Sequence, residues 1–494
     1  MQMRALWALA ALGAAACGGV VGCGGCSSPH GTTINPPPGD GGGGNPDGPP
    51  PPPPSDAGPV SGTLRVDPAN PRYFTAGHGA VYLTGSHTWG NFKDRAAVDP
   101  PPPFDYKTFL DFLVLHRHNF FRLWTWEQPH SSDNVPLFFT PFAWPRNGAT
   151  MASDGKPQFD LAHFDETYFD RMRDRVIQAR DRGIYVSIML FDGWDLNNGY
   201  NPTGGFPMAV GNNSNGVAIA PTDFPSLSKT AVTALQEAYI RKVIGKVNDL
   251  DNVLYEIANE TGGDSTAIDW QNHWVDFIHT LEKTMPKQHP VGMTSTYPGQ
   301  DSDLYASNAD WISPNTAIPT KPSDGSKVVL NDTDHSYGWA QMKSEGQARQ
   351  RAWAWKTLCL GAAPMFMDPY LETWTDRNSP SGSTPDPYWN VVRDALGYTA
   401  LYASRLDLER AVPSPALCST GFCLAEPGHQ YLVYQPASGG FKVTVAAGSY
   451  RAEWFNPATG QTTDAGTMVL SPGQQPFTPP ASITADAVLL LLAP

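Results

Sequence analysis

Short runs of β-branched and aromatic residues alternate with longer amphipathic stretches between Ser61 and Leu408. The short runs are hydrophobic almost throughout, which is typical of parallel strands that are covered on both faces. The longer stretches repeat apolar residues every three or four positions, which predicts helices. We expect strands over residues 80–89, 119–126, 184–192, 252–260, 289–295, 310–315, 327–335 and 363–370. Helical patterns between them include residues 105–118, 165–183, 235–250, 268–285 and 346–361.

Eight strand and helix units over roughly 340 residues predict an α/β fold, a (β/α)8 or TIM barrel. The link after the fifth strand is short, and no full helix can be placed there. A doubly wound open sheet is the main alternative. It is weakened by the polar residues that end nearly every strand, and by the lack of a phosphate-binding loop after the first strand.

The helical pattern stops after Leu408. The runs YLVYQPA, FKVTVAA, YRAEWFNPATG and AVLLLLAP are separated by Gly, Pro and Ser, which predicts a small C-terminal β-sandwich of about 85 residues. Few of its residues could carry out catalysis.

The amino-terminal residues resemble a signal for processing. Arg4 precedes the apolar run ALWALAALGAAA, and two candidate lipidation cysteines follow, Cys17 in AAAC and Cys23 in VVGC. Cys23 fits a bacterial lipobox better, and an ordinary secretory signal is the alternative. Residues 27–60 hold 12 Pro and 8 Gly among 34 residues, a composition that cannot bury a core. We therefore expect a lipid-anchored or secreted protein of the bacterial cell envelope.

The predicted organisation has four parts. They are a lipoprotein signal region (1–26), a disordered Pro/Gly-rich linker (27–60), a barrel (61–407) and a β-sandwich (408–494).

Composition narrows the classes of partner. Among 494 residues are 15 Trp, 18 Tyr and 22 Phe, which suits stacking on flat ligands such as sugars as well as core packing. The formal net charge of -14 argues against nucleic acid, because a phosphate backbone needs a basic face. The Walker loop, the HExxH helix and the GxSxG elbow do not occur in the sequence. No CxxC pair or His and Cys cluster has zinc spacing, so we expect neither a metal nor a cofactor.

Three cysteines lie beyond the leader. Cys418 and Cys423, in CSTGFC, are close enough in sequence to close a small hairpin disulfide in an oxidising compartment. Cys359, in WKTLCLG, is expected to be buried.

Two strand ends carry acids. In NVLYEIANE, residues 252–260, an apolar run ends in Asn259 and Glu260, and in a barrel the carboxyl ends of the strands form the active-site mouth. Cleavage of a glycosidic bond needs a second carboxylate. The seventh strand, KVVLNDTDH, offers Asp332 and Asp334, which share a face if the strand stays regular.

Several motifs in order carry a family resemblance. An Asn-Glu pair that ends strand four and an acid that ends strand seven resemble the catalytic arrangement of clan A glycoside hydrolases. LTGSHTWGNF, HNFFRLWTWE, YEIANE, VVLNDTDHSYGW and APMFMDPY together resemble the apiosidase-like barrel family of bacterial secreted glycosidases. GFCLAEPGHQYLVYQP and AEWFNPATGQT resemble the small collagen-binding type of domain that often follows it. The resemblance covers residues 62–494.

The resemblance implies roles for particular residues. Glu260 would be the general acid/base and Asp332 or Asp334 the nucleophile, although the clan usually has Glu at this position. Arg122, in NFFRLW, matches the clan's strand-two arginine, which would hold the nucleophile ionised. A structural ion pair is the alternative for Arg122.

Other residues at strand ends are expected to bind substrate. Aromatic residues would form walls of a sugar site, and polar ones would bind hydroxyl groups. Core packing is the alternative for the aromatic residues, and a barrel arginine is an alternative partner for Asp368. These candidates are His87, Trp89, Trp126, Glu127, Asp192, Trp194, Asn259, His335, Asp368 and Tyr370.

We therefore expect a glycoside hydrolase that acts on a poly- or oligosaccharide through two carboxylates, with retention favoured. The membrane would be contacted only through a lipid anchor. A glycan- or matrix-binding protein without turnover is the first alternative, and a peptidase the second. A metal-dependent hydrolase is disfavoured because GSHTW offers one His where such barrels begin with an HxH pair.

Overall fold

The structure is a computed structural model that describes residues 58–131, 137–193, 196, 204–220, 223–294, 296, 299–315, 321–333, 339–373, 376–380 and 385–494. Within these residues no helix is long and apolar enough to cross a membrane.

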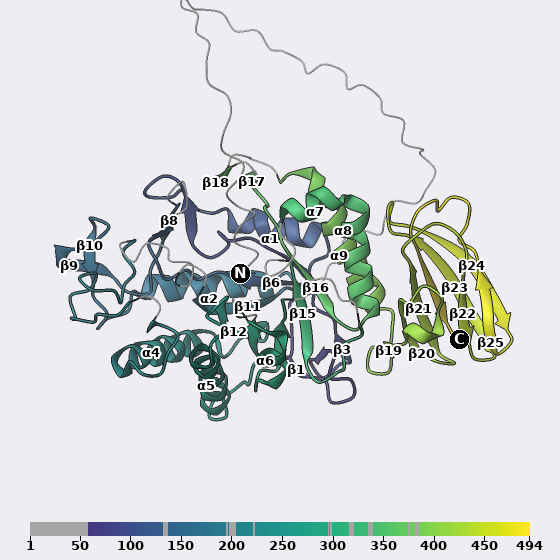
Figure 1. Ribbon diagram of the computed structural model, residues 1–494, viewed down its shortest axis with the longest axis horizontal. Coiled ribbons are helices and arrows are strands. Elements are labelled where there is room, and N and C mark those ends of the chain that lie inside the picture. Colours follow the sequence, from purple (N-terminus) through teal and green to yellow (C-terminus); the bar gives the residue numbers. More distant parts are fainter. Residues whose placement is uncertain are drawn as a thin grey trace, which may run out of the picture. The chain divides into compact units, whose positions relative to one another are not determined.

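Eight parallel strands form a nearly closed barrel, and this confirms the predicted fold (Figure 1). Strands that follow one another in the chain lie side by side, and β16 returns to pair with β4. Between β4 and β6 single hydrogen bonds replace a ladder, as from Asn119 N to Thr84 O at 3.1 Å. The barrel strands are β4 (Gly85–His87), β6 (Phe120–Leu123), β11 (Tyr185–Asp192), β12 (Val253–Asn259), β13 (Val291–Thr294), β14 (Trp311–Ser313), β15 (Val328–Asp332) and β16 (Ala363–Met367).

Burial explains why the strand runs are hydrophobic. Every residue of β11 and every residue of β12 is buried, because side chains face either the barrel interior or the surrounding helices. The buried charged side chain of Glu256 on β12 is tolerated because it finds a partner in Arg122.

Helices cover the outside of the barrel. Asp105, Asp165 and Asp264 cap α1, α2 and α5, each accepting a hydrogen bond from a backbone N–H of the first turn. In its described part, the link after the fifth strand holds the short α6, in keeping with the expectation that no full helix fits there. The hydrophobic pattern did not predict α9. The helices are α1 (Tyr106–Leu115), α2 (Glu166–Arg180), α4 (Thr230–Val247), α5 (Ser265–Glu282), α6 (Asp301–Ala306), α7 (Trp339–Glu345), α8 (Gln347–Cys359), α9 (Asn390–Ala403) and the 3-10 turn η2 (Pro387–Trp389).

Small antiparallel sheets lie beside the barrel sheet. One precedes the first barrel strand, one lies between β6 and α2, one combines a strand from before β6 with two from after it, and one follows β16. Their strands are β1 (Arg65–Val66), β2 (Phe74–Thr75), β3 (Ala80–Val81), β5 (Asp94–Ala96), β7 (His130–Ser131), β8 (Leu137–Thr140), β9 (Arg146–Met151), β10 (Pro157–Phe159), β17 (Glu372–Thr373) and β18 (Asp376–Pro380).

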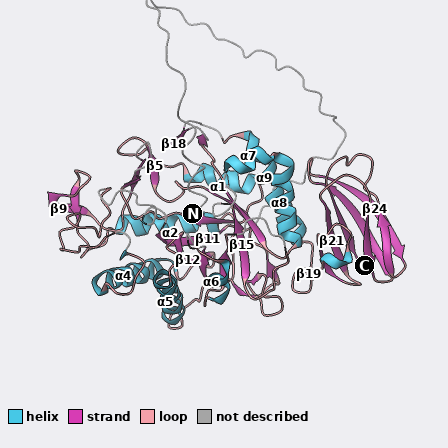
Figure 2. Cartoon of the chain, viewed as in Figure 1, coloured by secondary structure: helices cyan, strands magenta, loops and turns pink. Residues whose placement is uncertain are grey.

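The C-terminal part consists almost wholly of antiparallel strands (Figure 2). A six-stranded and a two-stranded sheet contribute side chains to a shared core, including Tyr431, Trp454 and Leu489 from the first and Val443 from the second. The domain boundary predicted between residues 407 and 408 stays a prediction. The elements are β19 (Val412–Pro413), η3 (Pro415–Leu417), β20 (Cys423–Glu426), β21 (Gln430–Gln435), β22 (Phe441–Val445), β23 (Gly448–Asn456), β24 (Gln461–Leu470), β25 (Gly473–Phe477) and β26 (Ala487–Leu492).

The predicted disulfide is not formed in this structure. Cys418 and Cys423 are buried free thiols, as is Cys359. A hydrogen bond with Cys423, together with hydrogen bonds to the side chain and backbone of Thr420, lowers the pKa of Cys418 to about 6. The hairpin therefore brings the two side chains together, as the spacing predicted, but as a thiol pair.

Candidate active site

The carboxyl ends of four barrel strands bring the predicted acids to one mouth. Asp192 ends β11 in register with Asn259, which ends β12, and Glu260 follows. Asp332 ends β15, and β16 connects it to β4, which His87 ends. Parallel strands place their carboxyl ends at the same rim, so residues far apart in sequence meet here.

Arg122 lies at the centre of this mouth and is fully buried. Its guanidinium donates to both carboxylate oxygens of Glu256, with the Nε to Oε2 distance at 2.9 Å. It also donates from Nη1 to Asp332 Oδ2 at 2.7 Å and from Nη2 to Asn259 Oδ1 at 3.0 Å. A buried cation is thus shared between two buried carboxylates on strands four and seven, and each carboxylate accepts a charge-assisted hydrogen bond from it.

This network changes two expectations. Arg122 contacts the strand-seven acid Asp332, as the resemblance implied, but its bidentate partner is Glu256. Glu256 was not among the predicted site residues, although a charged residue inside the apolar run YEIANE is the same signal that identified Arg122. The side-chain oxygen of Asn259 accepts from Arg122, and the expected contact of Asn259 with a sugar hydroxyl stays a prediction.

His87 is the second donor to Asp332. His87 Nε2 lies 2.8 Å from Asp332 Oδ2, and the indole Nε1 of Trp124 donates to His87 Nδ1 at 3.0 Å. Because an indole N–H can only donate, Nδ1 must accept, and the ring proton is on Nε2. Trp124 therefore sets the tautomer in which His87 donates to the carboxylate.

Glu260 has a backbone and an electrostatic environment that are both unusual. Its φ of 43° lies in the left-handed region, which costs a non-glycine residue roughly 1–2 kcal/mol. Burial, and then the nearby carboxylate of Asp192, raise its pKa to about 8, while Arg122 opposes and Asp332 adds to the rise. A strained carboxyl group that stays protonated at neutral pH is a feature of functional sites.

A tight approach of two strand ends holds Asp192 beside Glu260. Gly193 N donates to Asn259 O at 2.7 Å, and a Cβ at this glycine would lie 2.6 Å from that oxygen. Only glycine permits this distance. The Asp192 carboxylate also accepts from Gln128 Nε2 at 3.3 Å.

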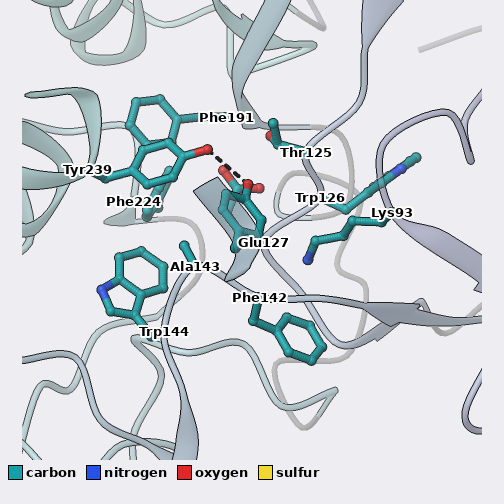
Figure 3. Close-up of a pocket in the computed structure, with 11 residues that line it drawn as sticks. Lys93, Thr125, Trp126, Glu127, Phe142, Ala143, Trp144, Phe191, Phe224 and Tyr239 are labelled. Atoms are coloured by element: carbon teal, nitrogen blue, oxygen red, sulfur yellow. Dashed lines mark hydrogen bonds between the residues drawn. The ribbon is translucent and has the colours of Figure 1, made fainter. Parts of the chain in front are cut away.

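Glu127 lines a small cavity of about 20 Å³ and contacts the backbone of Asp192 (Figure 3). Its carboxylate accepts the Asp192 backbone N–H with both oxygens, at 3.0 and 2.9 Å. Lys93 lines the same cavity, with its amine pointing inward. Burial lowers the pKa of Lys93 to about 7, and burial followed by Asp192 raises the pKa of Glu127 well above its usual range.

One predicted substrate-binding residue, Trp126, is packed in the core instead. Trp126 is stacked between Trp124 and Phe139 and is 6% exposed, so it does not form a wall of an open sugar site. Trp89 remains partly exposed at the rim. The aromatic-wall prediction therefore fails for Trp126 because this ring has other rings on both faces.

The structure does not bring the two strand-eight candidates, Asp368 and Tyr370, to the mouth. Asp368 is fully buried and binds Arg393 of α9 with both oxygens, at 2.7 and 2.6 Å, which lowers the pKa of Asp368 despite its burial. Tyr370 is buried against Phe109 and Phe112 of α1. Both side chains point out of the barrel toward helices, so neither can reach a substrate in the mouth.

Five predicted residues lie outside the described parts of the structure. They are Trp194, Asp334, His335 and the two candidate lipidation sites Cys17 and Cys23. Among the described residues, no group of three or more His, Cys, Asp or Glu side chains is placed to hold a metal ion.

Comparisons with known proteins bear on the fold. A family model described as "Domain of unknown function (DUF6298)" matches residues 130–312, and one described as "Putative collagen-binding domain of a collagenase" matches residues 421–492. No curated protein matches the chain.

Solved structures are similar over most of the chain. One, titled glycoside hydrolase, has 13% sequence identity and a TM-score of 0.57, and the match covers 87% of this chain and 97% of the other. A glycoside hydrolase family 5 structure from Bacteroides vulgatus has 12% identity and a TM-score of 0.55, with 87% and 94% covered. The chain shares the fold of these glycoside hydrolases.

Proposed function

We propose that this chain is a glycoside hydrolase that cleaves O-glycosidic bonds through Glu260 and Asp332, with retention of anomeric configuration. One observation carries the proposal. Two carboxyl groups share a barrel mouth but have opposite surroundings: Asp332 accepts hydrogen bonds from Arg122 and His87, while the pKa of Glu260 is raised to about 8. Carboxyl groups whose environments favour opposite protonation states supply the acid and the anion that glycoside cleavage needs.

Asp332 would be the nucleophile. The guanidinium of Arg122 and the Nε2–H of His87 both donate to its Oδ2 and stabilise the negative charge. The carboxylate of Asp332 would attack the anomeric carbon as the bond to the departing oxygen breaks. The product of this step is a covalent glycosyl ester, in which the carboxylate has lost its charge.

Glu260 would act first as acid and then as base. As the acid it protonates the departing oxygen, which requires that it be protonated at neutral pH, as a pKa of about 8 provides. Asp332 contributes to that raised pKa, and formation of the ester removes its negative charge. The pKa of Glu260 then falls, so the same group can take a proton from the water that releases the sugar.

The apiosidase-like resemblance is part of the proposal and leaves the sugar and linkage open, because one fold carries many specificities. An aspartate in place of the usual strand-seven glutamate makes the nucleophile one methylene shorter. Asp334, which lies outside the described residues, is therefore the competing assignment. Its variant belongs in any test.

The experiment is hydrolysis of a broad panel of plant and microbial glycans by residues 61–494. Native protein, Glu260→Gln, Asp332→Asn and Asp334→Asn are compared, and the anomer first formed is read by proton NMR. We expect release of sugar by native protein and by Asp334→Asn, retention in the product, and loss of activity in the other two variants. An inverted product would exclude the covalent intermediate.

A glycan- or matrix-binding role is the second candidate, because residues 421–492 match a family model named for collagen binding. Glycan binding without release of sugar would favour it. We also keep the proposal of a lipid-anchored or secreted envelope protein. Substitution of Cys23, and separately of Cys17, should identify the residue that incorporates labelled palmitate.

A further inference from the structure

Glu127 is placed where it cannot serve as the substrate ligand that its strand position predicted. Its carboxylate lies among the aromatic side chains of a cavity that includes Phe191, Trp144 and Tyr239 (Figure 3). Both of its oxygens accept the same donor, the backbone N–H of Asp192. Glu127 is thus directed at the backbone of strand three rather than at the mouth.

Packing alone does not require an acid at this position. An apolar side chain of similar size would fill the space without desolvating a carboxylate, and replacement of buried charges by apolar groups is often neutral or stabilising. The cavity holds a second costly group, the amine of Lys93, which is 1% exposed and lies 4.3 Å from the centre of the Phe142 ring. Buried charges that weaken stability in this way cluster where they serve function.

A short chain of contacts connects Glu127 with Glu260. Glu127 holds the Asp192 amide, the next residue Gly193 is bonded to Asn259 O, and Glu260 follows Asn259. Asp192 is also the nearby carboxylate with the largest effect on Glu260. Glu127 therefore fixes the position of Asp192, whose carboxylate lies at the mouth.

The charged groups around both acids come from several elements. Glu260 faces Asp192 of β11, Arg122 of β6 and Asp332 of β15. Glu127 faces Asp192 and Lys93, with the hydroxyls of Tyr168 on α2 and Tyr239 on α4 also nearby. Arg122 acts against protonation of Glu260, whereas Asp192 and Asp332 favour it.

We propose that Glu127 is a positioning residue: by holding the Asp192 amide it keeps the Asp192 carboxylate beside Glu260, and so keeps Glu260 protonated for its role as acid. This inference rests on the proposed function, in which protonated Glu260 is the acid. The geometric part of the inference, that Glu127 acts on Glu260 through Asp192, does not depend on which sugar is cleaved.

The test follows the protonation of Glu260 without a substrate. The carboxylic acid band of Glu260 is measured by infrared spectroscopy as a function of pH, with Glu260→Gln as the subtraction. In native protein we expect a midpoint near pH 8. In Glu127→Ala, Asp192 is released and the midpoint should fall by about one pH unit.

Two variants separate positioning from a general disturbance of the cavity. Glu127→Gln keeps an oxygen that can accept the Asp192 amide, so its midpoint should stay near that of native protein. Trp144→Phe alters the same cavity, where Trp144 packs against Phe164 and Tyr239, and should also leave the midpoint unchanged. An unchanged midpoint in Glu127→Ala, or a fall as large in either control as in Glu127→Ala, would overturn the inference.

If Glu127→Ala does not fold, Asp192→Asn tests the same inference in its place. It retains the backbone amide and the contact with Glu127 but removes the charge, so the midpoint should fall by at least as much as in Glu127→Ala. A native midpoint in Asp192→Asn would overturn the inference by itself. Failure of the proposed function looks different, because it leaves these midpoints as expected while Glu260→Gln cleaves glycans as well as native protein.

Discussion

Arg122 Nη1 lies 2.7 Å from Asp332 Oδ2, so a side chain of the second barrel strand holds the end of the seventh. The same guanidinium binds Glu256 and Asn259 of the fourth strand. Three strands are therefore tied together at the level where Glu260 emerges.

Loss of Arg122 should destabilise the protein strongly. Arg122→Met leaves Glu256 and Asp332 buried without their cation, and removal of one partner of a buried ion pair typically costs about 3–5 kcal/mol. Urea denaturation measures the change in the free energy of unfolding. Arg410→Met is the matched control, because its ion pair with Asp407 is exposed and should be worth less than about 1 kcal/mol. Equal losses in the two variants would mean that the central network contributes no more than a surface pair.

Trp124→Phe should lower kcat with little effect on KM. The variant keeps an aromatic ring but removes the N–H that fixes the His87 tautomer, so His87 can present an acceptor nitrogen to Asp332. A lost buried hydrogen bond of about 1–1.5 kcal/mol corresponds to roughly a tenfold decrease in rate. Steady-state kinetics on the glycan that native protein cleaves measures both constants.

Trp126→Phe is the control for that substitution. Its indole donates to the backbone oxygen of Trp89 and not to a side chain of the network. A decrease in kcat that is the same in both variants would show that ring size, rather than the tautomer of His87, matters.

The activity should fall as the pH rises through about 8. Glu260 must be protonated to act as acid, and its folded pKa of about 8 lies far above the usual value of 4.5. Its protonated fraction is therefore nearly complete at pH 6 and small at pH 10. The pH profile of kcat/KM reports this group in the free enzyme. A basic limb near pH 4.5 would contradict the environment described for Glu260.

Lys93→Met should stabilise the protein more at pH 6 than at pH 9. Burial lowers the pKa of Lys93 from 10.5 to about 7, so below pH 7 the folded protein carries an unfavourable buried charge. Between pH 7 and 10.5 the folded state sheds this proton before the unfolded state does, and the penalty shrinks as pH rises. The difference between the two pH values should be roughly 1–3 kcal/mol in the free energy of unfolding. An advantage that is equal at both pH values would show that Lys93 titrates normally.

Much of the fold follows from the sequence because burial on both faces leaves a clear pattern. The eight strand runs, and Glu260 at the tip of the fourth, were identifiable from apolar runs that end in polar residues. The family resemblance paired Arg122 with a strand-seven acid, and a charge inside an apolar strand needs a buried partner in any case. The same argument applies to Glu256. It was not assigned a role because Asn259 and Glu260, at the end of the same run, are the predicted site residues.

The errors arise where the direction of a side chain decides its role. Asp368 and Tyr370 end a strand as Asp332 does, yet they point outward, and the partner Arg393 lies on a helix that the hydrophobic pattern had not revealed. Strand position alone does not distinguish the two faces when every residue is buried. Glu127 shows the same limit, since its carboxylate turns away from the mouth toward the Asp192 amide.

The decisive measurement is hydrolysis of the glycan panel by native protein, Glu260→Gln, Asp332→Asn and Asp334→Asn. We expect release of sugar by native protein and by Asp334→Asn, and loss of most turnover in Glu260→Gln and Asp332→Asn, by about 10²-fold or more. Glycan cleavage by Glu260→Gln at the native rate, or binding by native protein without any release of sugar, would contradict the proposed function.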